Sequence, residues 1–87
     1  MSASDMENTP QASNVRAILE EAFGPEMANR IMVGSCNILS IEEKELYGEN
    51  LDLFIIRMEI VVPAIIGLKP GEVVVDRLWR LKGGPGT

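Results

Sequence analysis

Residues 51–82 read LDLFIIRMEIVVPAIIGLKPGEVVVDRLWRLK and contain most of the large apolar side chains of this 87-residue chain. The stretch divides into two apolar runs, Leu51–Leu68 and Val73–Leu81, with Lys69–Glu72 between them. Side chains this rich in Ile, Val and Leu leave water when the chain folds, so the stretch must form the core or contact a partner.

Both runs alternate in the manner of β-strands. Within Phe54–Val62 every second residue is apolar, and the intervening positions include Arg57 and Glu59. This alternation is typical of a strand with one covered face and one partly solvated face. Between the runs, Pro70 followed by Gly71 suits the centre of a type II turn. We therefore predict an apolar antiparallel β pair.

The second run also fits a helix. On a helical projection one face collects Val74, Val75, Leu78, Trp79 and Leu81. Its acids come first and its bases last, which suits the helix dipole. An all-α small bundle is therefore the alternative fold.

Helical spacing dominates the N-terminal half. Apolar residues recur every three or four positions from Val15 to Phe23, which predicts a helix that ends at Gly24. Pro25 then starts a second helix that we expect to stop at Gly34, and the two form a helical hairpin. Ser40–Glu43 matches a capping box and predicts a short acidic helix. The whole is a single α+β domain over residues 13–82, with flexible tails at 1–12 and 83–87.

The composition limits the partners. The chain has 13 acidic and 8 basic residues and a net charge of −5, with the acids concentrated in the first half. Such a charge disfavours direct nucleic-acid binding. A single cysteine and a polar N-terminus without a secretory signal favour a cytoplasmic location. The longest apolar stretch, Leu53–Leu68, is interrupted by charges and predicts no membrane span.

Little in the sequence points to catalysis. The chain has no histidine and none of the common nucleotide-binding, hydrolase or paired-cysteine motifs. Cys36 follows the predicted second helix and is expected to be structural. We expect no enzyme, no catalytic residue, no metal and no cofactor; the alternative is a small enzyme that uses Cys36 or the carboxylates. The densest group of carboxylates is Glu42, Glu43, Glu45, Glu49 and Asp52. Their spacing lacks the pattern of a calcium-binding loop.

The sequence favours a non-catalytic protein–protein interaction module, either an accessory, regulatory or assembly subunit of a larger complex or a homo-oligomer. Aromatic and arginine residues dominate binding hot spots, and the second face of the predicted sheet stays apolar. The predicted partner-binding residues are Trp79, Arg77, Arg80, Leu53, Ile55, Val61, Val74 and Leu78. The alternative is an acidic decoy that binds the basic groove of a nucleic-acid-handling protein through Glu20, Glu21, Glu42, Glu43, Glu45 and Glu49.

Overall fold

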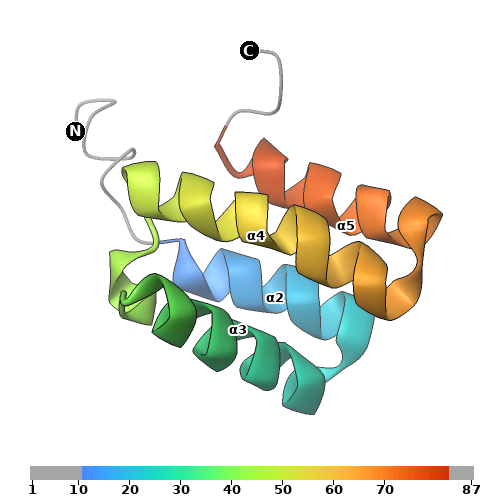
Figure 1. Ribbon diagram of the computed structural model, residues 1–87, viewed down its shortest axis with the longest axis horizontal. Coiled ribbons are helices and arrows are strands. Elements are labelled where there is room, and N and C mark those ends of the chain that lie inside the picture. The colour runs from blue at the N-terminus through green and yellow to red at the C-terminus, as the bar shows by residue number, and fades with distance from the viewer. Residues whose placement is uncertain (1–10, 83–87) are drawn as a thin grey trace.

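The computed structural model describes residues 11–82, and this part of the chain is helical with no β-strand. Within residues 11–82, four α-helices and one short 3₁₀ helix follow each other (Figure 1): α2 (Ala12–Phe23), α3 (Pro25–Leu39), η1 (Glu43–Glu45), α4 (Gly48–Ile66) and α5 (Leu68–Arg80). Successive helices run in opposite directions. The first hairpin, α2–α3, packs on the second, α4–α5, through contacts of α2 with α5 and of α3 with α4. The arrangement is a small up-down-up-down helical bundle.

The predicted β pair is wrong, and the α+β class with it: both apolar runs are helices, as in the all-α alternative. A nearly continuous apolar run satisfies a two-residue period and a 3.6-residue period equally well, so its length has to decide between them. The first run became the 19-residue helix α4, far longer than a usual strand. Its buried positions follow helical spacing and are Leu51, Phe54, Ile55, Met58 and Val62.

Pro70 and Gly71 do not form the predicted turn. They lie in the first turn of α5, where the missing N–H of a proline costs no helical hydrogen bond. The valines that favoured a strand lie within α5, which buries Val74, Val75 and Leu78. Tertiary packing of this face outweighs the modest helix propensity of valine.

The predicted N-terminal hairpin is present, with α2 ending at Phe23 and α3 starting at Pro25. The second helix is longer than predicted, because it continues through Gly34 to Leu39 and ends where Ser40 adopts a left-handed conformation (φ 59°). The predicted acidic helix is reduced to η1. Its capping box starts at Glu42, whose backbone N–H donates to the Glu45 carboxylate over 2.8 Å.

Both hairpins turn at a single glycine. Gly24 has φ 87° and ψ 161°, and Gly67 has φ 98° and ψ 164°. Essentially only glycine adopts this region, because a Cβ atom would clash with the backbone. The two corners therefore share one conformation, and each reverses the chain between helices without a longer loop.

Most of the N-terminal tail and all of the C-terminal tail predicted at 1–12 and 83–87 lie outside the described residues. Of the N-terminal segment, Gln11 and Ala12 are described. The backbone N–H of Gln11 donates to the backbone carbonyl oxygen of Leu46 over 2.8 Å, and Ala12 begins α2.

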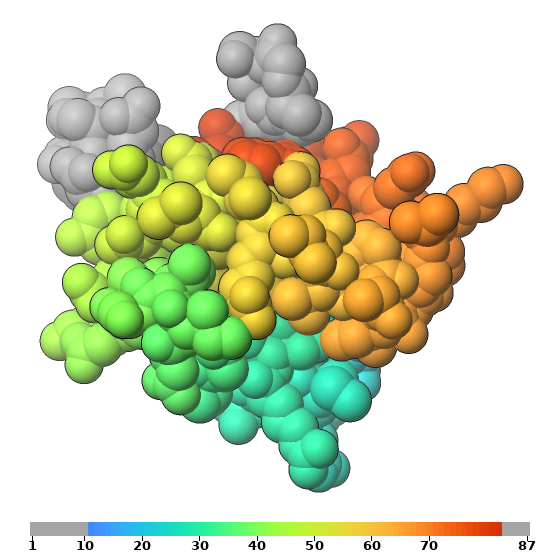
Figure 2. Space-filling view, in the orientation of Figure 1, coloured from blue at the N-terminus to red at the C-terminus, as the bar shows by residue number. Residues whose placement is uncertain are grey.

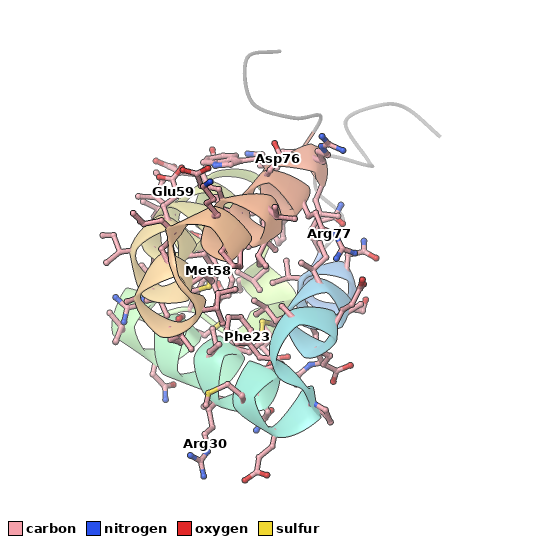
Figure 3. All side chains as sticks on the ribbon, turned by 90° about the vertical axis from the view of Figure 1, so that its right-hand side faces the viewer. Phe23, Arg30, Met58, Glu59, Asp76 and Arg77 are labelled. Atoms are coloured by element: carbon pink, nitrogen blue, oxygen red, sulfur yellow. The ribbon has the colours of Figure 1, made fainter. Side chains whose placement is uncertain are left out.

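All four helices contribute to one hydrophobic core. Met58 lies near its centre, between the two hairpins (Figure 3). The largest fully buried side chains come from every α-helix and from the segment before α4: Phe54, Leu19, Met32, Leu46, Leu51, Ile55, Met58, Leu78, Val15 and Val62. Because each hairpin supplies only part of this core, neither buries its apolar face without the other.

The two helices of the second hairpin approach each other closely at Gly71. A Cβ atom added to Gly71 of α5 would lie 2.8 Å from Cα of Pro63 in α4 and 2.9 Å from its Cγ. These atoms belong to the backbone and the ring of Pro63, so they cannot rotate away as a flexible side chain could. The absence of a side chain at Gly71 is what allows α4 and α5 to pack this closely.

We predict that Gly71→Ala destabilises the protein by about 1–2 kcal/mol, because the overpacking against Pro63 exceeds the gain in helix propensity. Gly34→Ala is the matched control: Gly34 also lies inside a helix, and an added Cβ would meet no atom within 4 Å. This control should be neutral or stabilising by up to about 1 kcal/mol. Urea denaturation of both variants measures the difference, and equal stabilities would contradict the close packing.

Candidate interaction surface

The predicted partner-binding residues separate into core and surface. Ile55, Val74 and Leu78 are buried between the helices and face no partner. Val61 is partly buried against the core, whereas Leu53 is 46% exposed on α4. The sheet face on which they were grouped does not exist, so the structure does not bring these residues together.

The two predicted arginines bind carboxylates of their own chain. The Arg77 guanidinium pairs with Glu21 over 2.9 Å and joins α5 to α2, and Figure 3 shows Arg77 on the side of α5 that faces α2. Arg80 pairs over 2.9 Å with Asp76, one turn earlier on α5. Hydrogen bonding and charge attraction from Arg77 lower the pKa of Glu21, and the same contact raises the pKa of Arg77.

This ion pair predicts a measurable titration. The pKa of Glu21 should be below the usual glutamate value in the native chain and should return to that value in Arg77→Gln, which NMR of the side-chain carboxyl carbons can follow. The stability that the pair contributes is present above the usual glutamate pKa and is lost as the pH falls through the lowered pKa. Arg80→Gln is the control and should leave Glu21 unchanged. An unshifted Glu21 in the native chain would contradict the pairing.

Trp79 borders a groove between α4 and α5. The groove has a volume of about 310 Å³ and is lined by Glu59, Pro63, Glu72, Val75, Asp76 and Trp79. The Trp79 indole N–H donates to the Glu59 carboxylate over 3.0 Å, which links the two helices. Figure 3 shows Glu59 and Asp76 from the two helices at the same edge of the bundle. Trp79 therefore has a structural hydrogen bond and also faces an open groove.

A second surface feature lies on the outside of α4. Leu53, Ile56 and Ile60 are 46%, 48% and 73% exposed, and Ala64 continues the row one turn later. Their spacing of three and four residues places them along one ridge of the helix. Figure 2 shows α4, in yellow and orange, across the middle of one face of the molecule with α3 beside it. We call these four residues the α4 outer stripe.

Sequence reasoning found Leu53 but missed Ile56 and Ile60, because it placed both on the covered face of a strand. A helical projection of residues 51–66 would have shown apolar residues around almost the whole circumference. A helix that is apolar all round is normally buried on every side. In this structure α4 is not: the outer stripe is exposed, and so are Glu49, Glu59 and Ile65.

Most of the acidic residues proposed for a decoy surface already have intramolecular partners. Glu21 pairs with Arg77, Glu43 with Arg16 over 2.6 Å, and Glu42 with Lys44 over 3.2 Å. Glu45 accepts the capping hydrogen bond of η1. Four of the six residues therefore form contacts within the chain, and their arrangement gives no support to a continuous acidic surface.

The described residues contain no cluster of three or more carboxylate, cysteine or histidine side chains that could hold a metal ion. Arg57 contacts the buried Ser35 hydroxyl over 3.3 Å, and Lys82 contacts Asp52 at the start of α4. The first contact joins α4 to α3, and the second joins the segment after α5 to α4. They do not converge on a shared site.

Cys36 is buried, and it lies within α3 because this helix continues past its predicted end at Gly34. Desolvation is the main cause that raises the pKa of its thiol; the Glu43 carboxylate raises it as well, and Arg16 lowers it. A buried thiol with a raised pKa is a poor nucleophile, because the thiolate is the reactive form.

We therefore predict that Cys36 reacts at least about tenfold more slowly with Ellman's reagent in the native protein than in urea-unfolded protein at the same pH. The native chain of the destabilised Gly71→Ala variant should react faster, because it opens more often. Equal rates in native and unfolded protein would show that the thiol is accessible.

No protein-family model matches the sequence, and neither the curated proteins nor the solved structures show a significant similarity to this chain. Among residues 11–82, no helix combines the length and the apolar character needed to cross a membrane.

Proposed function

We propose that this chain is a non-catalytic protein–protein interaction module that docks through the α4 outer stripe. The observation that carries the proposal is a row of large aliphatic side chains, Leu53, Ile56 and Ile60, exposed on the helix whose opposite side packs into the core. Solvent-exposed apolar rows of this kind mark interaction sites on small proteins.

The energetics support docking. Ile60 is 73% exposed, and full burial of one such side chain stabilises a complex by about 1.5–3 kcal/mol before the costs of association. A chain of 87 residues buries a smaller fraction of its apolar surface than a larger domain does. Covering the stripe would add to the apolar surface that this small protein buries.

The occupant that we propose is a second copy of the same chain. Residues spaced three and four apart form the kind of seam along which two helices pack side by side. The four side chains of the stripe are uncharged, so two copies can approach along them despite a net charge of −5. A two-fold axis across α4 would bury the same stripe on both molecules. In such a pair the module acts as a homo-oligomeric accessory or assembly subunit.

We predict that the chain forms a dimer in sedimentation velocity at micromolar concentrations and that Ile60→Glu weakens the dimer at least about tenfold, because it places a charge in an apolar contact. Val73→Glu is the matched control. Val73 is 61% exposed on α5, away from the stripe, and undergoes the same chemical change. Circular dichroism should show the native helix content in both variants.

Two results would contradict the proposal. One is a wild-type chain that stays monomeric over the whole concentration range. The other is a Val73→Glu variant that dissociates as readily as Ile60→Glu, since the effect would then come from added charge and not from the stripe.

A further inference from the structure

The groove between α4 and α5 has two kinds of lining. Pro63, Val75 and Trp79 form apolar walls, and Glu59, Glu72 and Asp76 supply carboxylates. Pockets that combine apolar walls with a few convergent polar groups are the usual form of a binding site. Here the polar groups are all acidic, so the occupant must be apolar along its length and positively charged at its end.

The charge in the groove is only partly neutralised by the chain itself. Asp76 is paired with Arg80. Glu59 accepts the neutral Trp79 indole N–H, and no lysine or arginine of residues 11–82 forms an ion pair with Glu59 or Glu72. Two carboxylates with uncompensated charge therefore border one apolar hollow.

Pro63 forms part of one wall of the groove. It lies inside α4 and has no backbone N–H, so it cannot donate the usual helical hydrogen bond to the Glu59 carbonyl oxygen. The same residue packs against Gly71 and sets the spacing of the two helices. The groove therefore has a rigid apolar ring beside its carboxylates.

We propose that this groove binds an arginine side chain presented by an amphipathic segment of a protein partner. The guanidinium group is planar, carries five N–H donors, pairs with carboxylates in a forked geometry and stacks on aromatic rings, which matches Glu59, Glu72 and the Trp79 indole. The methylene stem of arginine packs on Pro63 and Val75. Lysine offers a single strongly hydrated charge and fits the apolar walls and the indole less well.

The proposed arginine site is separate from the proposed pairing through the α4 outer stripe. The groove is lined on α4 by Glu59 and Pro63, and none of the four residues of the stripe is among its lining residues. Binding at the groove is measured below the concentrations at which the chain pairs, so either proposal can fail while the other holds.

The test uses a short helical peptide of alanine, leucine and arginine without aromatic residues. Trp79 is the single tryptophan of the chain, so its fluorescence reports directly on the groove. We expect the peptide to shift the Trp79 emission in a saturable way. Glu59→Gln and Glu72→Gln should each weaken binding about three- to fivefold, and together about tenfold or more, because each removes one ion pair at a partly exposed site. The affinity should fall as salt is added.

The controls separate a specific site from general attraction to an acidic protein. Glu49→Gln removes the same charge from α4 at an exposed position outside the groove and should change the affinity less than twofold. A peptide with citrulline in place of arginine keeps the shape without the charge and should not bind. A lysine peptide should bind several-fold more weakly than the arginine peptide.

Three outcomes would overturn the proposal. The first is equal weakening by Glu49→Gln and Glu59→Gln, the second is binding of the citrulline peptide with unchanged affinity, and the third is peptide binding that leaves the Trp79 emission unchanged. Equal binding of the lysine and arginine peptides would overturn the preference for a guanidinium group.

Discussion

Helix α4 has more apolar circumference than its neighbours α3 and α5 can cover. The inner side packs Phe54 and Met58 into the core, and this burial holds the two hairpins together. The outer side carries Ile56 and Ile60 into solvent. The helix that supplies the centre of the core therefore also supplies a row of exposed aliphatic side chains. Stability and interaction depend on the same element.

The glycines decide how this helix meets the others. Gly67 turns the chain between α4 and α5 in a conformation that side chains do not tolerate, and Gly71 lets α5 approach the backbone of Pro63. This close packing brings Glu59 and Trp79 within hydrogen-bond distance and leaves the groove beside them. A wider spacing of the two helices would separate the groups that line the groove.

Most of the charged side chains described above form ion pairs within the chain. Arg77 ties α5 to α2 through Glu21, and Arg16 ties α2 to η1 through Glu43. These exposed or partly exposed pairs orient neighbouring elements more than they stabilise them. The carboxylates left without a basic partner are more informative about function, and two of them, Glu59 and Glu72, border the same groove.

The sequence alone determined where the apolar mass lies and where the N-terminal hairpin turns, because helical spacing before Gly24 and a proline after it permit few other structures. It could not distinguish strand from helix in residues 51–82, since a run apolar at nearly every position fits both periods. Only the tertiary structure decided this, by setting which side of each helix the other hairpin covers. The tertiary structure alone also decided that Leu78 lies in the core, that Ile60 lies on the surface and that Trp79 contacts Glu59 across two helices. The reason is that burial and distance depend on packing between segments far apart in the chain.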